Sequence, residues 1–217
     1  MRPSLQALMK KIKNKTVFII GGGPSAKNVD FDLLQDEVVV CVNDAYRFFP
    51  NATVIYWVDE SWVAENYDEV MSHKCDMVFT SKPAQHITYD KINDPKTSAN
   101  TYILKRTGDA GYDPNYDCVM GNNSGVQVLN LVANMKPSKV VLIGYDMRRA
   151  NDGATHFHTQ YRPPIGDYIY DDLFLPSITS FEKQRKNHGN TVPIINANPD
   201  SAVRCFPFGN YKDHITK

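Results

Sequence analysis

The chain has 217 residues, enough for one α/β domain with a substantial hydrophobic core. Its 24 basic side chains equal its 24 acidic side chains in number, so the formal net charge is zero. A neutral chain argues against broad electrostatic binding of DNA, RNA or an anionic membrane, whereas a single nucleotide needs only local groups.

The four cysteines lie far apart, and the absence of a C-x-x-C spacing predicts reduced thiols rather than a zinc site or a redox pair. The first fifteen residues lack the apolar segment of a signal peptide, and no run is long enough for a membrane span. We therefore expect a cytoplasmic protein. The same fifteen residues predict a short amphipathic helix that covers either a sheet edge or a partner subunit. The sequence therefore leaves open whether the chain forms a homo-oligomer.

The first predicted strand, Thr16–Ile20, runs into three glycines followed by Pro-Ser. Glycine lets the backbone approach a ligand closely, and proline suits the first turn of a helix. Free N–H groups at such a helix start favour a phosphate, so the turn predicts a nucleotide pocket. The alternative is a strand-to-helix turn that needs glycine only for packing. The candidate nucleotide-binding residues here are Gly21, Gly22, Gly23, Pro24 and Ser25.

Apolar β-branched runs and helical spacings alternate along the rest of the chain. Further strands are predicted at Glu37–Val42, Ala52–Val58, Met77–Thr80, Thr101–Lys105, Lys139–Ile143 and Thr191–Asn196. Helices are predicted at Ser61–Met71, from Val126 to Met135, and at Ser177–His188; the rest of 85–119 is predicted as loop. This alternation predicts a Rossmann-like α/β fold, a mostly parallel sheet flanked by helices, as a single nucleotide-binding domain over residues 1–217. Residues 148–176 are predicted to form a lid within it.

Ligands of such sheets bind beyond the carboxyl ends of the strands, and polar residues gather there in this sequence. Asn43 and Asp44 end the second strand, about twenty residues past the glycines, where dinucleotide enzymes carry an acidic residue for the ribose. Asn43 both donates and accepts, which suits a base edge or a ribose; the alternative is an Asx-turn. Asp146 ends the strand Lys139–Ile143 in the same way.

The segment Asn123-Ser124-Gly125 opens a predicted helix. Asn or Ser there caps the helix, and the same free N–H groups also suit a phosphate or a carboxylate. Both interpretations remain open from the residues alone.

His156 and His158 are the catalytic candidates. They lie on one side of an extended segment, separated by Phe157. A general base is favoured over a metal site, because the histidine pKa lies near neutrality. The alternative is a pair of solvated histidines in a loop.

Several of these segments occur in the order found in a known family. They are Val17–Ile20 with Gly-Gly-Gly-Pro-Ser-Ala-Lys-Asn-Val-Asp, Val40-Cys-Val-Asn43, Asn123-Ser-Gly-Val126, Lys139-Val-Val-Leu-Ile-Gly-Tyr-Asp146 and Ile194-Ile-Asn-Ala-Asn-Pro-Asp-Ser201. Together they resemble bacterial sialyltransferases of the lipooligosaccharide type. The same core resembles a broader family that includes archaeal hydroxymethylpterin pyrophosphokinases. Uncharacterised phage and prophage proteins with Gly-x-Asp-Met and Thr-His-x-His look most similar.

This resemblance implies a metal-independent transfer from a CMP-linked sugar, with a lid histidine that deprotonates the acceptor hydroxyl. It implies phosphate contacts at Gly22, Gly23 and Ser25, a nucleotide contact at Asn43, phosphate or sugar-carboxylate contacts at Ser124 and Gly125, and a ribose or cytosine contact at Asp146. The sequence departs from the family at Gly22, where the family has Asn, and at Asn123, where it has Thr. The family's catalytic histidine also lies nearer the last helix than His156 and His158.

We therefore expect a nucleotide-dependent transferase, most favourably a glycosyltransferase that needs no cofactor and joins a nucleotide-sugar donor to a hydroxyl acceptor. One alternative is an ATP-dependent pyrophosphokinase acting on a small hydroxymethyl compound, with Mg²⁺ held by Asp44, Asp59 and Asp146. Others are a non-catalytic nucleotide-binding module and an NAD-binding protein that depends on Asp44.

Overall fold

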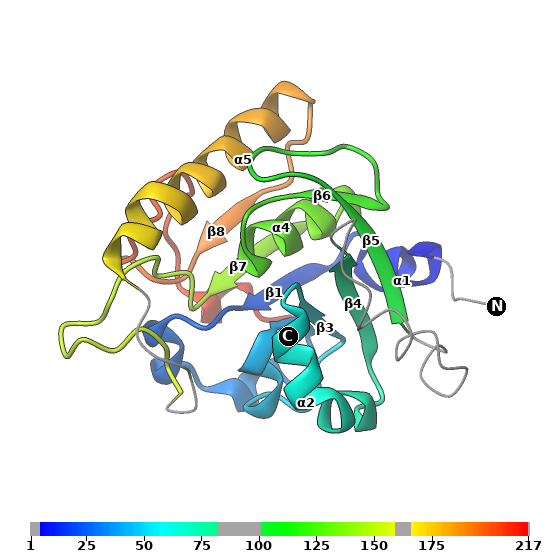
Figure 1. Cartoon of the computed structure of the whole chain (residues 1–217), viewed down its shortest axis with the longest axis horizontal. Helices are drawn as coiled ribbons and strands as arrows, with labels where there is room; N and C mark the ends of the chain where they lie inside the picture. Colours follow the sequence, from blue (N-terminus) through cyan, green and yellow to red (C-terminus); the bar gives the residue numbers. More distant parts are fainter. Residues whose placement is uncertain (1–4, 82–100, 159–165, 217) are drawn as a thin grey trace.

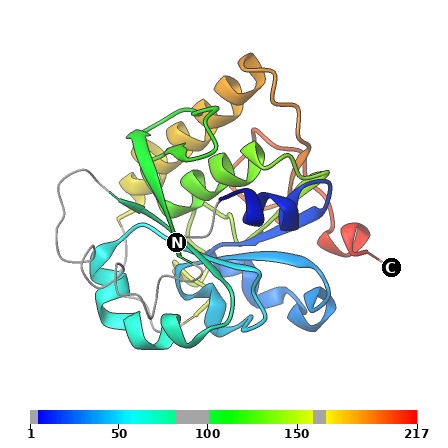
Figure 2. The same cartoon turned by 90° about the vertical axis from the view of Figure 1, so that its right-hand side faces the viewer.

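A computed structural model describes residues 5–81, 101–158 and 166–216 and shows a parallel α/β sheet covered by helices on both faces (Figures 1 and 2). Every strand pairing in these ranges is parallel, which confirms the predicted Rossmann-like class. The part of the predicted loop up to residue 100 and lid residues 159–165 lie outside the described residues. No helix in the described ranges is both long and apolar enough to span a bilayer.

The sheet has eight strands in the order β6-β5-β4-β3-β2-β1-β7-β8. Their bounds are β1 Thr16–Ile20, β2 Val38–Val42, β3 Val54–Trp57, β4 Asp76–Ser81, β5 Thr101–Gly108, β6 Cys118–Met120, β7 Lys139–Ile143 and β8 Ile194–Asn196. Strand β1 has β2 on one side and β7 on the other, with Val17 opposite both Val38 and Val140. The chain therefore changes direction across the sheet between β1 and β7, which is where parallel α/β sheets form a crevice for ligands.

The α-helices are α1 Leu5–Ile12, α2 Glu60–Ser72, α4 Ser124–Asn134 and α5 Leu175–Asn187. Shorter turns are the 3₁₀ helices η1 Pro24–Asn28, η2 Phe31–Leu34, η3 Asn43–Arg47 and η6 Tyr211–His214, and the π-helical turn η5 Ile169–Phe174. Helix α5 ends as the sequence predicts, because Gly189 follows it with a positive φ of 75°.

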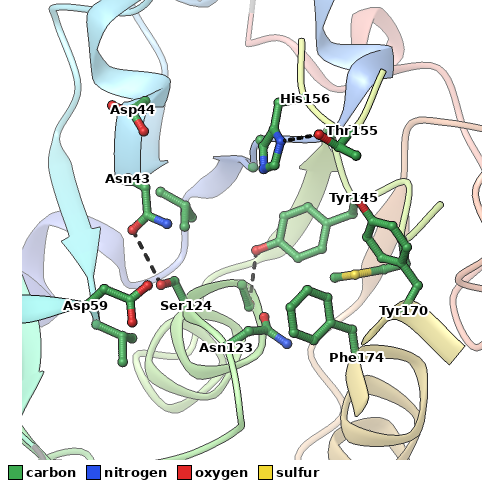
Figure 3. A pocket seen from close by; sticks show the side chains of 18 of the residues that line it. Asn43, Asp44, Asp59, Asn123, Ser124, Tyr145, Thr155, His156, Tyr170 and Phe174 are labelled. Carbon is green, nitrogen blue, oxygen red and sulfur yellow. Dashed lines mark hydrogen bonds between the residues drawn. The ribbon is translucent and has the colours of Figure 1, made fainter. Parts of the chain in front are cut away.

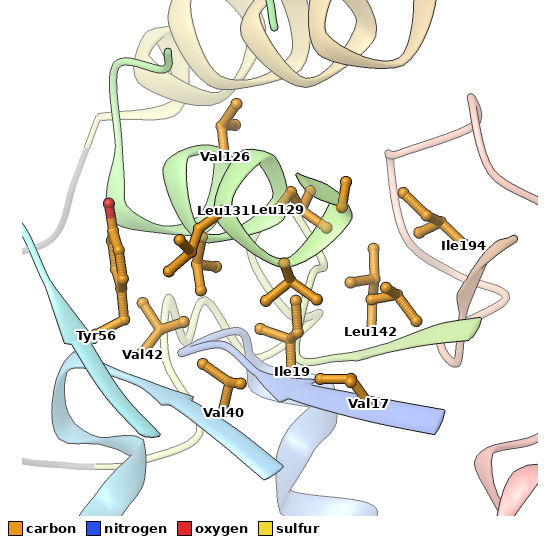
Figure 4. Packing of buried hydrophobic residues seen from close by; sticks show 14 of the residues in the cluster. Val17, Ile19, Val40, Val42, Tyr56, Val126, Leu129, Leu131, Leu142 and Ile194 are labelled. Carbon is orange, nitrogen blue, oxygen red and sulfur yellow. The ribbon is translucent and has the colours of Figure 1, made fainter. Parts of the chain in front are cut away.

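Two apolar cores cover the two faces of the sheet. Helices α1, α4 and α5 pack on one face, where α4 lies over the strands with Leu129 above Ile19 and Leu142 (Figure 4). The turns η1 to η3 and helix α2 pack on the other face, around the fully buried Phe18 and Phe49. The strands are buried on both sides, which explains why they read as continuous apolar runs. These cores fix the carboxyl ends of the strands in space.

The structure corrects three details of the predicted elements. Cys118–Met120 forms the edge strand β6, although the sequence predicted loop there. The segment after the glycines forms the five-residue 3₁₀ turn η1 rather than the start of an α-helix. The π-helical turn η5 joins α5 directly, so ordered helical structure begins within the predicted lid rather than after it.

Candidate functional site

A cavity of about 240 Å³ lies at the carboxyl ends of the strands, beside the switch between β1 and β7 (Figure 3). Its walls come from the ends of β1, β2, β3 and β7, the start of α4, the segment around His156, and η5. Ten of the thirteen residues that the sequence nominated lie on this wall: Gly21, Gly22, Gly23, Asn43, Asp44, Asn123, Ser124, Gly125, His156 and His158.

The start of α4 forms one wall of the cavity. The side chain of Asn123 caps the helix, with Oδ1 accepting from the Val126 N–H at 3.0 Å. The hydroxyl of the buried Ser124 donates to Asn43 Oδ1 at 3.4 Å. Within the described ranges no hydrogen-bond acceptor is found for the backbone N–H groups of Ser124 and Gly125. These groups, together with the positive end of the helix dipole, suit an anionic group in the cavity.

Asn43 and Asp44 follow β2 and face the cavity differently. Asn43 has a left-handed φ of 50°, a conformation that asparagine tolerates better than most residues, and its side chain points toward Ser124 (Figure 3). Asp44 is buried, and its carboxylate accepts from the Trp62 indole N–H at 3.0 Å and pairs with Arg47 at 3.3 Å. Asn43 is therefore the better placed of the two to contact a ligand.

The two histidines approach the cavity from the segment after β7. Nδ1 of His156 lies 2.9 Å from Thr155 Oγ1, and its ring projects into the cavity (Figure 3). Burial lowers the pKa of His156 to about 4, with a further contribution from His158. His158 is more confined, because its ring stacks on Phe48 and packs edge-on against Phe157. Burial also lowers the pKa of His158, against the attraction of Asp44.

The glycine turn after β1 is packed against protein groups. The N–H of Gly23 donates to the Gly144 carbonyl at 2.9 Å, and the N–H of Ser25 donates to Asp146 Oδ1 at 3.2 Å. A Cβ on Gly23 would overlap the Asp146 carboxylate, and one on Gly22 would lie 2.8 Å from His156 Cδ2. The carboxylate of Asp146 thus occupies the helix start where the sequence predicted a phosphate.

Pro24, Ser25 and Asp146 lie apart from the main cavity and line a second one on the other side of the glycine turn. Asp146 accepts from the Ser25 hydroxyl and from Asn198 Nδ2, each at 2.8 Å. Burial raises the pKa of Asp146, and these hydrogen bonds oppose the rise. As nucleotide ligands, the three residues remain predictions.

The carboxylates proposed for Mg²⁺ are not brought together. Asp44 and Asp59 line the main cavity, whereas Asp146 lines the second one. Within residues 5–81, 101–158 and 166–216, no group of three histidine, cysteine or acidic side chains is arranged to hold a metal ion. Of the three carboxylates, only Asp44 and Asp59 therefore line the same cavity.

Sequence analysis missed several residues of the cavity wall, among them Tyr145, Tyr170, Phe174 and Arg106. Tyr145 lies two residues after the end of β7, a position that could have nominated it, and its hydroxyl donates to the Gly125 carbonyl at 3.0 Å. Tyr170 and Phe174 reach the cavity from η5, whose π-helical winding leaves no recognised signal in the sequence. Arg106 comes from β5, which β4, β3 and β2 separate from β1 in the sheet.

Comparison of the sequence with protein-family models finds no match, and comparison with curated proteins finds no significant match.

Proposed function

We propose that the protein transfers a group from a nucleotide-linked donor to a hydroxyl acceptor. The favoured donor is a CMP-linked or other nucleotide sugar. The observation that carries the proposal is the cavity beside the β1–β7 switch. It is lined by the start of α4, where two amides have no acceptor among the described residues, and by an imidazole that is neutral at physiological pH. A transferase of this kind needs those two features together: a site for the leaving phosphate and a base for the attacking hydroxyl.

The donor phosphate is assigned to the start of α4, next to Ser124 and Gly125. Both residues line the cavity and their amides have no acceptor among the described residues, whereas the amides of Gly23 and Ser25 already donate to the Gly144 carbonyl and the Asp146 carboxylate. Asn43 lies beside Ser124 and offers both a donor and an acceptor to the nucleoside. This assignment moves the phosphate away from the position that the glycine pattern favoured.

The base is assigned to His156 rather than His158. With a pKa of about 4 its imidazole is neutral at physiological pH and has a nitrogen lone pair that can take a proton. In the proposed step the acceptor oxygen attacks the donor carbon while its proton passes to His156. The bond from that carbon to the phosphate oxygen breaks, and the nucleotide leaves with the bonding electrons.

The alternatives receive less support. A pyrophosphokinase with Mg²⁺ on three carboxylates would need Asp146 in the main cavity, and Asp146 lines the second one. An NAD site that depends on Asp44 receives less support, because the Asp44 carboxylate already accepts from the Trp62 indole N–H and pairs with Arg47. A non-catalytic nucleotide-binding module fits the same cavity and is separated from a transferase only by turnover.

A thermal-shift screen against CMP, CDP, UDP, GDP, ATP and NAD, each with and without Mg²⁺, tests the proposal first. A ligand that binds only the folded chain raises its melting temperature. We expect a shift with CMP or CDP that does not require Mg²⁺. A shift only with ATP and Mg²⁺ would favour the pyrophosphokinase, and no shift with any nucleotide would contradict the donor site.

Turnover of the matching nucleotide sugar is then compared in His156→Ala and in the matched control His188→Ala, an exposed histidine at the end of α5. Loss of a general base reduces the rate by roughly 10²–10⁴-fold, whereas the control keeps the wild-type rate. Nucleotide binding without turnover in the wild type would favour the binding module.

A further inference from the structure

We propose that Asp59 binds the 2′,3′-diol of the donor's ribose, and that the cavity therefore selects ribonucleotides over 2′-deoxyribonucleotides. The inference rests on the proposed function, because it adds one contact to the same nucleotide. It also depends on a feature of the free protein, which is an aspartate that does not cap the helix it precedes.

Asp59 stands immediately before helix α2 and has the extended backbone of an N-cap residue, with φ of −80° and ψ of 119°. An aspartate at this position normally accepts a hydrogen bond from one of the first backbone N–H groups of the helix. The side chain of Asp59 makes no such bond. Asp30, before the 3₁₀ helix η2, behaves in the ordinary way, because its Oδ1 accepts from the Asp32 N–H at 3.2 Å. Helix α2 therefore lacks the side-chain cap that its sequence offers.

The carboxylate of Asp59 lines the main cavity instead, on the side where Ser124 and Asn43 lie (Figure 3). Strand β3 neighbours β2, with Tyr56 opposite Val42, so Asp59 and Asn43 leave the sheet at adjacent points. Among the described residues, neither an ion pair nor a hydrogen bond is found for the exposed Asp59 side chain. A local rule that is broken without a compensating protein contact is expected at functional sites.

The charge of Asp59 decides which part of a nucleotide it can contact. A carboxylate has two acceptor oxygens and no donor, so it repels a phosphate and suits a pair of neighbouring hydroxyls. The ribose is bonded directly to the phosphate, whereas the base lies beyond the ribose. With the phosphate beside Ser124, the 2′,3′-diol is therefore the nearest pair of donors. Acidic residues at strand ends bind ribose hydroxyls in this way in dinucleotide sites.

The other carboxylate of the cavity, Asp44, does not suit this role, because it already accepts from the Trp62 indole N–H and pairs with Arg47. A magnesium ion on Asp59 would need several further oxygen ligands. In the part of the chain that the structure describes, no three acidic, histidine or cysteine side chains are arranged to hold a metal. A diol needs only the one carboxylate that faces the cavity without a partner.

Isothermal titration calorimetry with CDP and 2′-deoxy-CDP, in EDTA so that no metal contributes, tests the assignment. We expect the wild type to bind CDP about tenfold more tightly, the size of one hydrogen bond to a charged group. Asp59→Ala should bind both nucleotides equally, and Asp59→Asn, which keeps one acceptor oxygen, should retain part of the preference. Asp30→Ala, which changes an exposed N-cap aspartate outside the cavity, is the matched control and should keep the full preference.

Two results would overturn the inference. One is equal binding of CDP and 2′-deoxy-CDP by the wild type, a comparison that needs no variant to fold. The other is an unchanged preference for CDP in Asp59→Ala. A contact from Asp59 to the base, to the transferred sugar or to a metal ion would give one of these two results, because none of them depends on the ribose 2′-hydroxyl.

The same titrations with ribose 5-phosphate and 2-deoxyribose 5-phosphate separate this inference from the proposed function. If no nucleotide binds, but the wild type prefers ribose 5-phosphate and Asp59→Ala does not, only the transferase proposal fails. If nucleotides bind without a preference for the ribose form, only the role of Asp59 fails. If neither pair of ligands is discriminated and no nucleotide binds, both fail.

Discussion

Two turns at the same edge of the sheet offer backbone amides, and they differ in what those amides contact. At the glycine turn after β1, the amides of Gly23 and Ser25 donate to the Gly144 carbonyl and the Asp146 carboxylate. At the start of α4, Asn123 caps one amide, while Ser124 and Gly125, whose amides have no acceptor among the described residues, line the main cavity. A glycine-rich turn can therefore look like a phosphate site in the sequence and be filled by the protein's own carboxylate.

The largest expected effect comes from filling the glycine turn. Alanine at Gly23 would overlap the Asp146 carboxylate and the Gly144 carbonyl, so Gly23→Ala should lower the free energy of unfolding by about 3 kcal/mol. Urea unfolding measures this. Gly108→Ala is the matched control, because its Cβ would meet only the flexible end of Met120 at 3.0 Å. Equal, small losses in both variants would mean that the turn is open rather than packed.

The second prediction removes the carboxylate that fills the turn. Asp146→Ala leaves the Ser25 N–H, the Ser25 hydroxyl and the Asn198 amide without their acceptor and should cost about 2–3 kcal/mol of unfolding free energy. Asp146→Asn keeps an oxygen acceptor and should cost less. Wild-type stability in Asp146→Ala, combined with loss of nucleotide binding, would instead make Asp146 a ligand contact.

Two serine variants test which of the two turns binds the phosphate. Ser124→Ala keeps the amide and removes the hydroxyl, which lies beside the proposed phosphate and Asn43. It should weaken CMP or CDP binding about tenfold, because a hydrogen bond from that hydroxyl to a charged phosphate contributes about 1.5–3 kcal/mol. Ser25→Ala should lower the baseline melting temperature and keep the nucleotide-induced shift, since its hydroxyl donates to Asp146. Isothermal titration calorimetry on both variants measures the nucleotide affinity. Weaker binding in Ser25→Ala with unchanged binding in Ser124→Ala would indicate that the phosphate binds at the glycine turn.

The fourth prediction is a pH dependence from the partly buried imidazole of His156. The pKa of His156 falls from an ordinary 6.5 to about 4 in the folded protein, so below pH 6.5 the unfolded chain binds protons more readily. Stability from this group is complete above pH 6.5 and is lost as the pH falls toward 4. His156→Gln should flatten the fall in melting temperature over that range, whereas the exposed control His188→Gln should not. Identical slopes in all three proteins would contradict the lowered pKa of His156.

Much of this fold could be predicted from the sequence, because buried parallel strands leave continuous β-branched runs such as Val38–Val42. The positions of the strand ends then placed Asn43 at the predicted site, whereas Ser124 was nominated as part of a predicted helix start. Strand β6 has three residues and is too short for a periodic signal. Tyr170 and Phe174 depend on a π-helical turn, which sequence patterns do not specify.

The function of the glycine turn could not be inferred from its own residues. Asp146, which fills it, is 121 positions away from Ser25 in the sequence. The three glycines indicate that another group approaches the backbone closely at this turn. A bound phosphate and the protein's own carboxylate would both explain that close approach. Only the pairing of β1 with β7, which brings Gly144 and Asp146 against the turn, distinguishes them.

The central claim is that a donor phosphate binds at the start of α4 and not at the glycine turn. The most direct measurement is a crystal structure of the protein with CDP. The account predicts a phosphate oxygen within hydrogen-bond distance of the Ser124 or Gly125 N–H, with Asp146 still bonded to Ser25. A phosphate against the Ser25 N–H, with the Asp146 carboxylate displaced, would contradict it.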